Sequence, residues 1–479
     1  MSTIYDLEPK AFFYWFAEIM KIPRCSGNEK QISDFLMQFA KERKLEAYQD
    51  EALNVIIKKP GTAGYEKSPV LIIQGHMDMV CEKTPDSPHN FCTDPIKPVI
   101  KSDFMYADNT TLGGDDGVAV AYGLAILDSD TLAHPPIEVF ITTDEEEGMT
   151  GIMNFDASLL QGKQLLNIDS EEEGIFLVSC AGGANTLCTF DIQEQQAKGK
   201  FLKLNIEGLL GGHSGIEIIK QRANAIKILG RVLYKIAQTE KITLAAITGG
   251  SKHNAIAKYA EAVIAAENPE SVISIVKSFT EELQKEYRAS DKDLSVKISE
   301  TPALSKMYTN ELSENLIDFM MMVPDGVQYM NLEIPGMVKT SLNNGVLEQK
   351  DGQLQFTLSV RSSAESSSEE ILSVIEACTK RCKGNFSINS IYPPWEYEPK
   401  SVLRDTAVKT YKEVTGKEPL IEAIHAGLEC GIIKKAIPGL DALSIGPNLY
   451  DVHTPDEHLS ISSVKRTWDF LVKLLENLK

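Results

Sequence analysis

The sequence has no long apolar run, and its first residues lead us to expect no cleavable leader. A membrane span needs roughly 18 uninterrupted apolar residues, and the apolar stretch near the start of the chain is broken by Glu18. That stretch also lacks the basic segment and the small-residue cleavage site of a signal peptide. We therefore expect a cytoplasmic protein that makes no contact with a membrane.

Positive charge is also scarce. The 479 residues include 48 lysines and arginines against 68 aspartates and glutamates, so the formal net charge is -20. A protein that binds nucleic acid normally carries a basic patch that neutralises phosphates. The charge balance argues against a nucleic acid partner and favours a small ligand.

Cysteines are few and lack the spacing of a metal-binding motif. The eight cysteines are scattered over the chain without a CxxC pair. In a chain of this length, the pattern predicts reduced thiols, with neither a disulfide framework nor a cysteine-rich zinc site. Any bound metal would then be held by histidines and carboxylates.

The chain does contain an alternation of strand and helix patterns, and its length predicts two or three domains. Residues 1–184 hold apolar runs that finish in polar clusters, as parallel strands covered by helices do. Residues 185–395 have strand and helix patterns typical of an α+β domain, with a hairpin pattern at Asp351 and Gly352. After a proline-rich linker, residues 396–479 return to the first pattern. We predict an α/β domain (1–184 and 396–479) with a mixed, largely parallel sheet, and an inserted α+β domain (185–395).

Side chains that bind metals follow the apolar runs of the first domain. They are His76, Asp78, Asp115, Asp116, Glu145, Glu146, Glu147, Asp169 and His453. The carboxyl ends of strands in an open α/β sheet meet at one crevice, so these groups are expected to converge there. Two histidines with several carboxylates suit zinc, manganese or cobalt better than calcium or magnesium.

The number of these groups favours two metal ions, because it exceeds what one tetrahedral site uses. Two ions bridged by a carboxylate and a water would activate the nucleophile and stabilise an oxyanion. Of the adjacent Glu145 and Glu146, one could bind metal while the other acts as a general base.

Each group alone has a simpler explanation. A lone His-x-Asp is more often a surface pair, an acidic run is more often a solvated loop, and Asp115 with Asp116 could merely cap a helix. Asp169 precedes another acidic run, and His453 could be an ordinary loop histidine. Their joint placement after four apolar runs is what favours a metal centre.

Six motifs occur in an order that resembles the aminoacylase and dipeptidase family of dinuclear zinc peptidases. They are GHMDMV, ADNTTLGGDDG, TDEEEGMTG, LLNIDSEEEG, GGHSG and HTPDEH. The chain is most similar to the aminoacyl-histidine dipeptidase branch, also called peptidase D or carnosinase-like, over essentially its whole length. The resemblance implies metal-dependent hydrolysis of dipeptides, either Xaa-His or of broad specificity, by a metal-bridged water.

The resemblance also implies roles for individual residues. His76 and Asp169 would bind one metal, Glu146 and His453 the other, and Asp115 both. Asp78 would hold the His76 ring, and Glu145 would be the general base. The inserted domain would be a lid that forms a homodimer and supplies His213 to the oxyanion. Residues that would grip the substrate are Asn254, Arg361 and His425.

Several points stay open. Without the resemblance, His213 and Asn254 fit turns, Arg361 a surface charge and His425 a packed loop. Asp116 stands where asparagine is common in the branch, and His253 where arginine is common, while Glu147 adds a third adjacent carboxylate. The same metal centre could serve an N-acyl amino acid deacylase, and a non-catalytic metal-binding scaffold is a further alternative.

Overall fold

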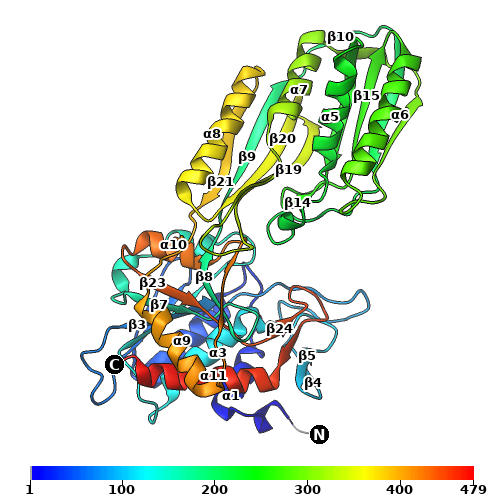
Figure 1. Ribbon diagram of the computed structural model, residues 1–479. Coiled ribbons are helices and arrows are strands. Elements are labelled where there is room, and N and C mark those ends of the chain that lie inside the picture. The colour runs from blue at the N-terminus through cyan, green and yellow to red at the C-terminus, as the bar shows by residue number, and fades with distance from the viewer. Residues whose placement is uncertain (1–2) are drawn as a thin grey trace. The chain divides into compact units, whose positions relative to one another are not determined.

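The computed structural model describes residues 3–479, which form two compact units (Figure 1). The first unit is discontinuous in sequence and comprises residues 3–179, Tyr397–Ala423 and Leu428–Lys479. The second unit comprises Cys180–Glu396 and Ile424–Gly427. The sequence predicts residues 185–395 for the inserted domain.

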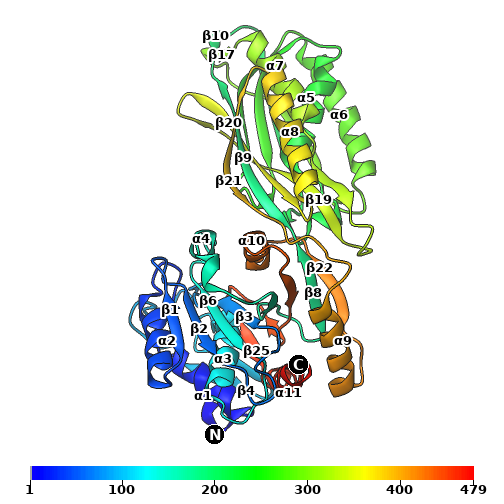
Figure 2. The same ribbon diagram turned by 90° about the vertical axis from the view of Figure 1, so that its left-hand side faces the viewer.

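The first unit is built on an eight-stranded sheet with the order β1-β2-β6-β3-β7-β23-β8-β22. Its strands are β1 (Glu46–Gln49), β2 (Val55–Lys59), β6 (Ile137–Thr142), β3 (Leu71–His76), β7 (Gln164–Asn167), β23 (Asp441–Ser444), β8 (Ile175–Cys180) and β22 (Leu420–Ile424). Figure 2 shows β1, β2, β6 and β3 side by side. A smaller sheet contains β24 (Leu449–Tyr450), β25 (His458–Ser460), β5 (Phe104–Ala107) and β4 (Pro98–Lys101).

The large sheet is mixed, as predicted. Strands β6, β3, β7 and β23 are parallel to one another, whereas β1 with β2, β2 with β6 and β23 with β8 pair antiparallel. Every residue of β3 and β6 is buried, as expected of central parallel strands covered on both faces. Four central strands of the sheet therefore form a continuous parallel part.

Helices cover this sheet. They are α1 (Lys10–Ile19), α2 (Lys30–Glu42), α3 (Gly114–Asp128), α4 (Thr150–Met153), α9 (Val402–Thr415), α10 (Glu429–Ala436) and α11 (Ile461–Asn477), with short 3-10 turns at η1 (Ile4–Asp6) and η2 (Ala157–Leu159). Helix α3 packs on both β3 and α1 and is buried along nearly its whole length. A helix that is apolar on all sides belongs in a core, which explains its central place.

The second unit has a nine-stranded antiparallel sheet. Its strands are β16 (Ser295–Glu300), β11 (Lys200–Glu207), β15 (Ala260–Ala266), β13 (Ile242–Gly250), β19 (Val338–Lys350), β20 (Gln353–Ser362), β9 (Gly182–Asp191) and β21 (Asn385–Tyr392) in that order, with β18 (Gly326–Met330) beside β19. The predicted hairpin joins β19 to β20, and both its turn residues, Asp351 and Gly352, have positive φ. Two short pairs are β10 (Glu194–Gln196) with β17 (Lys306–Tyr308) and β12 (Gly212–His213) with β14 (Ala255–Ile256).

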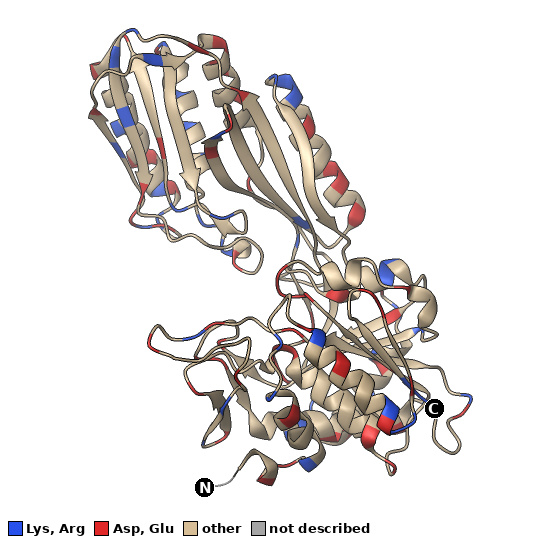
Figure 3. Ribbon diagram, turned by 180° about the vertical axis from the view of Figure 1, so that it is seen from behind, with Lys and Arg blue, Asp and Glu red and all other residues tan. Residues whose placement is uncertain are grey.

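The helices of the second unit are α5 (Ala225–Ala237), α6 (Pro269–Glu286), α7 (Asn310–Met322) and α8 (Glu365–Arg381), with a 3-10 turn at η3 (Ile218–Lys220). Helix α8 carries Glu365 in its first turn and Lys380 and Arg381 in its last, which complements the helix dipole. Figure 3 shows blue residues at one end of this helix and red residues along the rest of it. Within residues 3–479, no helix combines the length and apolar character that crossing a membrane requires.

Candidate metal centre

Three neighbouring parallel strands of the first unit deliver the candidate ligands. His76 is the last residue of β3, Glu145 and Glu146 follow β6, and Asp169 follows β7. Because β6, β3 and β7 are parallel neighbours, their carboxyl ends meet at the same edge of the sheet. The convergence expected from the sequence is therefore present in the fold.

Asp115 lies between two histidines. Its Oδ1 is 3.1 Å from the Nε2 of His76, and its Oδ2 is 3.1 Å from the Nε2 of His453. The backbone of Asp115 is extended, with φ -81° and ψ 111°, so it departs from the helical path of α3. One carboxylate thus presents one oxygen to each histidine, which is the arrangement that a bridging ligand needs.

The remaining ligand candidates flank this pair. Glu146 Oε2 is 2.9 Å from His453 Nε2, and Asp169 Oδ1 is 3.6 Å from His76 Nε2. Two groups of three side chains bring their ligand atoms within 4.8 Å of one another: His76 with Asp116 and Asp169, and His76 with Asp115 and Glu146. Histidine nitrogens and carboxylate oxygens are the donors that zinc and similar metals take, so the side chains fit a metal centre.

Asp116 enters this cluster more closely than the sequence alone suggested. It is 1% exposed, and its Oδ2 accepts a hydrogen bond from the backbone N–H of His76 at 3.1 Å. Burial and the nearby Asp169 raise its pKa well above the ordinary value. Asp116 is therefore a further ligand candidate.

The electrostatics of the cluster also fit a bound cation. Burial raises the pKa values of Glu146 and Asp169, because several carboxylates are withdrawn from water together. Hydrogen bonds to Asp115 and Glu146 raise the pKa of His453 to about 11. A bound cation would neutralise the negative charge that these carboxylates bring together.

A second carboxylate orients the metal-facing histidine. Asp78 is fully buried, and its Oδ1 lies 3.3 Å from the Nδ1 of His76. It also accepts hydrogen bonds from the backbone N–H groups of Glu145 at 3.2 Å and Glu146 at 3.3 Å. One buried side chain thereby fixes the histidine and the acidic loop relative to each other.

Of the three adjacent glutamates, Glu145 and Glu146 are partly buried, whereas Glu147 is exposed. Burial raises the pKa of Glu145 well above the ordinary value. Neither of the groups that could hold a metal includes Glu145, although it adjoins Glu146. It is thus a carboxyl beside the centre that remains available for proton transfer.

The second unit gathers the other predicted residues around Gly215. A side chain at Gly215 would meet the His425 carbonyl oxygen at 2.6 Å, the His213 ring at 3.0 Å and the Arg361 Nε at 3.2 Å. Asn254 is adjacent because its carbonyl accepts the Ser214 N–H at 2.9 Å. His425 is 5% exposed, and burial together with Arg361 lowers its pKa to about 3.

His213 has a defined arrangement of its ring nitrogens. Its Nδ1 accepts the backbone N–H groups of Gly215 and Ile216, each at 3.2 Å. Burial and the nearby Arg361 lower its pKa, so the ring is neutral near pH 7. The ring proton is then on Nε2, which can donate a hydrogen bond.

The other four histidines lie outside these groups. The Nδ1 of His134 is 2.7 Å from the Pro135 carbonyl oxygen, and His89 packs edge-on against Phe91. His458 stacks on two tyrosines, and His253 is exposed. Their structural or solvated placement agrees with the simplest interpretation of the sequence.

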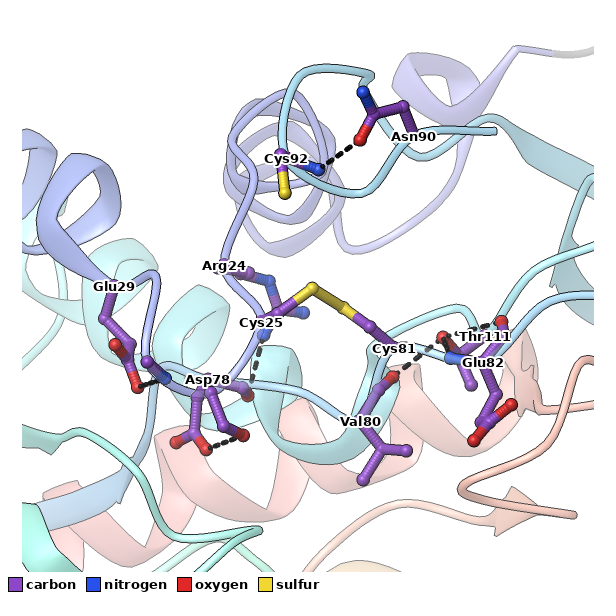
Figure 4. Close-up of a disulfide and its surroundings, with 12 residues drawn as sticks. Arg24, Cys25, Glu29, Asp78, Val80, Cys81, Glu82, Asn90, Cys92 and Thr111 are labelled. Atoms are coloured by element: carbon purple, nitrogen blue, oxygen red, sulfur yellow. Dashed lines mark hydrogen bonds between the residues drawn. A yellow bond between two sulfur atoms is a disulfide. The ribbon is translucent and has the colours of Figure 1, made fainter. Parts of the chain in front are cut away.

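The expectation of reduced cysteines is wrong for one pair. Cys25 and Cys81 form a disulfide with a Cα–Cα distance of 5.7 Å (Figure 4). Cys81 lies close to Cys25 because Met79, two residues before Cys81, forms a β-bridge with Cys25. A separation of 56 residues gives no local spacing pattern, which is why the sequence did not reveal the pair.

Three buried residues near the centre were also missed. The carboxylate of Glu457 accepts backbone N–H groups from residues 112–115. Arg24 donates to the carbonyl oxygens of Met77 and Asp78 at 2.9 and 3.1 Å. Glu429 Oε2 accepts hydrogen bonds from Gln74 at 2.5 Å and Thr142 at 2.6 Å. Of these three residues, Glu457 alone lies in one of the six motifs, HTPDEH.

Comparison with known proteins shows full-length relatives. Residues 72–477 match the model of peptidase family M20/M25/M40. The chain is 34% identical to the cytosol non-specific dipeptidase of Escherichia coli (strain K12) over 482 positions, covering 100% of this chain and 99% of the relative.

Solved structures give the same picture. Aminoacylhistidine dipeptidase from Vibrio alginolyticus superposes with a TM-score of 0.94 at 35% identity, covering 99% of this chain and 98% of that one. Aminopeptidase PepT from Bacillus cereus is 15% identical with a TM-score of 0.57, covering 98% and 99% of the two chains. The latter likeness concerns the fold alone.

Proposed function

Since the chain belongs to peptidase family M20/M25/M40, we propose that it is a metal-dependent dipeptidase. The observation that carries the proposal is the position of Asp115 between His76 and His453, with the carboxyl of Glu145 nearby. The full-length likeness to two dipeptidases supports the choice of substrate. The reaction is hydrolysis of the single peptide bond of a dipeptide, either Xaa-His or of broader sequence.

The centre would hold two divalent ions, and zinc suits its donors, with manganese or cobalt as alternatives. His76 and Asp169 would hold one ion, Glu146 and His453 the other, and Asp115 both. When bound, the ions polarise the scissile carbonyl and lower the pKa of water. Asp116, whose Oδ2 accepts the His76 N–H, would add a buried carboxylate to the group formed by His76 and Asp169.

Glu145 is the proposed general base. Its burial raises its pKa, and a base works best when its pKa lies near the working pH. The Glu145 carboxylate removes a proton from the attacking water and passes it to the nitrogen of the leaving amine. The position of its backbone is fixed by Asp78, which accepts the Glu145 N–H.

The second unit is proposed to be a lid and a dimerisation domain. His213 would donate its Nε2 proton to the developing oxyanion, because its Nδ1 is already an acceptor. Asn254, Arg361 and His425 would bind the ends of the substrate. The Escherichia coli relative is named a cytosol enzyme, and we propose a cytoplasmic location here as well.

A substrate panel tests this function. The metal-loaded protein should cleave dipeptides, including Xaa-His and β-alanyl-histidine, and should leave tripeptides and N-acetyl amino acids intact. Cleavage of N-acetyl amino acids in place of dipeptides would identify a deacylase. Failure to cleave either class would favour a non-catalytic scaffold.

A further inference from the structure

Glu457 organises the loop that carries Asp115. Its Oε2 accepts the backbone N–H groups of Leu112 at 2.7 Å and Gly113 at 2.9 Å, and its Oε1 those of Gly114 at 2.7 Å and Asp115 at 3.3 Å. The side chain is 2% exposed. Because the first N–H groups of a helix have no partner inside it, this one carboxylate satisfies the start of α3.

The glycines of this loop permit the close approach. A methyl group at Gly114 would lie 2.5 Å from Leu449 Cδ2 and 3.2 Å from Glu457 Oε1. Gly113 has φ +70°, a conformation that costs other residues energy. The GGDDG sequence therefore serves the contact with Glu457 as well as the placement of Asp115.

The backbone of Glu457 is tied to the other metal-facing loop. Its N–H donates to the carbonyl oxygen of Thr454 at 3.1 Å, which closes a turn directly after His453. His453 itself has φ +63°, an uncommon conformation for a residue with a side chain, which the surrounding structure must hold in place. Glu457 thus connects the loop of His453 to the loop of Asp115.

Arg24 contacts the same loop through a backbone carbonyl oxygen. It is 3% exposed and donates to the carbonyl oxygen of Gly113, while its Nη1 donates to the carbonyl oxygens of Met77 and Asp78. The buried guanidinium and the Glu457 carboxylate attract each other. Their charges therefore compensate one another inside the first unit.

We propose that Glu457 is a positioning residue of the metal centre. It sets the separation between Asp115 and His453, so the loops are correctly arranged before metal binds. The inference rests on the metal centre of the proposed function and not on which substrate is cleaved. In this proposal, Glu457 neither binds a metal ion nor transfers a proton.

The test compares Glu457→Gln with Glu138→Gln. Glu138 is also 2% exposed and accepts the backbone N–H groups of Gln161 and Gly162 at 2.9 and 3.0 Å, but it lies outside both groups of metal-binding side chains. Dissociation constants for zinc are measured by competition with a chelator, without substrate. Thermal unfolding of both variants is followed as a measure of stability.

Glu457→Gln should weaken zinc binding about 10- to 100-fold, as loss of a group that orients ligands does, while Glu138→Gln should lose stability without losing zinc affinity. Unchanged zinc binding in Glu457→Gln, or an equal loss in Glu138→Gln, would overturn the proposal. If Glu457→Gln does not fold, Glu457→Asp is measured against Glu138→Asp with the same two outcomes. Because zinc binding is measured without substrate, the comparison can be interpreted even if the protein binds zinc and cleaves no dipeptide.

The disulfide supports a second, independent inference. Both Cys25 and Cys81 are partly exposed, and the bond joins the segment before α2 to the segment after β3 (Figure 4). Disulfides are rare in the cytoplasm. In a protein with a cytosolic relative, this bond is better suited to reversible formation than to permanent stabilisation.

The segment that contains Cys25 also contacts Asp78 through the next residue. Ser26 Oγ donates to Asp78 Oδ2 at 2.8 Å, and the Met79 N–H donates to the Arg24 carbonyl oxygen at 3.1 Å. Asp78 in turn contacts the Nδ1 of His76. The crosslink therefore restrains a segment that is two hydrogen-bonded steps from the metal-facing histidine.

We infer that the redox state of Cys25 and Cys81 controls metal retention. A dithiol reductant supplies two electrons and two protons, the sulfur–sulfur bond breaks to two thiols, and the dithiol becomes a disulfide. The freed segment then restrains Asp78 and His76 less, so zinc leaves more readily. The inference rests on the same proposed metal centre.

Oxidised and reduced protein are compared by zinc dissociation rate after anaerobic desalting, so that no small thiol competes for metal. The double variant Cys25→Ser with Cys81→Ser has no thiol to bind zinc there, and Cys92→Ser controls for the exposed thiol. Zinc should dissociate faster from the reduced protein and from the double variant, and only proteins with both cysteines should respond to reductant. Equal rates for oxidised and reduced protein would overturn the inference.

Discussion

Asp78 and His76 meet through a carboxylate and an imidazole, with Asp78 Oδ1 3.3 Å from His76 Nδ1. The other nitrogen of the same ring, Nε2, lies 3.1 Å from Asp115 Oδ1. The two ring nitrogens thus have separate partners: Nδ1 contacts the buried Asp78, and Nε2 contacts Asp115 in the candidate centre. Such a carboxylate fixes the orientation of a metal-binding histidine and raises its basicity.

Replacement of this carboxylate should weaken metal binding. In Asp78→Asn, we expect the dissociation constant for zinc to rise about 10- to 100-fold, because the amide holds the His76 ring less firmly. A chelator competition assay measures the change. Asp103→Asn is the matched control, since Asp103 binds Ser460 and Ser462 and no histidine. Wild-type affinity in Asp78→Asn would contradict the role given to it.

Glu145→Gln should separate chemistry from metal binding. Loss of a general base typically lowers kcat about 10²- to 10⁴-fold, while the metal content should stay unchanged because Glu145 is not among the proposed ligands. Metal analysis and dipeptide hydrolysis are measured on the same sample. The exposed neighbour gives the control variant Glu147→Gln, which should keep its activity. Near-normal turnover by Glu145→Gln would show that another group accepts the proton.

His213→Ala should lower kcat about 10²- to 10³-fold, as removal of one oxyanion donor does. The metal content of this variant should not change, because His213 is not among the proposed metal ligands. His253→Ala replaces an exposed histidine of the same unit and serves as the control. If both variants lose the same activity, the effect belongs to the unit and not to a donor at His213.

Glu429 predicts a pH dependence of stability in the metal-free protein. Burial raises its pKa to about 7 from the ordinary 4.5. A carboxyl with a raised pKa stabilises the folded state fully below pH 4.5, and this contribution is lost as the pH rises through 7. Relative to Glu429→Gln, the free energy of unfolding of the wild type should fall by up to about 3 kcal/mol over this interval.

Urea unfolding of both metal-free proteins at about pH 5 and about pH 8 measures this difference. The wild type should lose stability relative to the variant at the higher pH. A difference that stays constant with pH would show that Glu429 titrates normally in the folded protein.

The sequence predicted those parts of the site that lie at the ends of strands. His76 and Asp169 follow apolar runs, and the parallel pairing of β3 with β7 brings them together. Their positions follow from a local pattern and a general rule about α/β sheets. The pairing of Asp115 with both histidines needed the resemblance, because no spacing rule connects residues 115 and 453.

Other features could not be read from a local pattern. Glu457 binds backbone N–H groups more than 300 residues away, at separations of 342 to 345, and every residue type except proline has a backbone N–H. Arg24 likewise contacts carbonyl oxygens. The disulfide of Cys25 with Cys81 depends on the fold of the chain between them, because the two cysteines are separated by 56 positions in the sequence. Contacts of these kinds leave no mark in residue spacing.

The most direct test of the proposed function is a metal titration of metal-free protein with a dipeptide as substrate. We predict no cleavage without metal, and activity that rises with added zinc, manganese or cobalt until two ions are bound per chain. Dipeptide cleavage at an undiminished rate by metal-free protein would contradict the account. So would a protein that binds two ions and cleaves no dipeptide with any of the three metals.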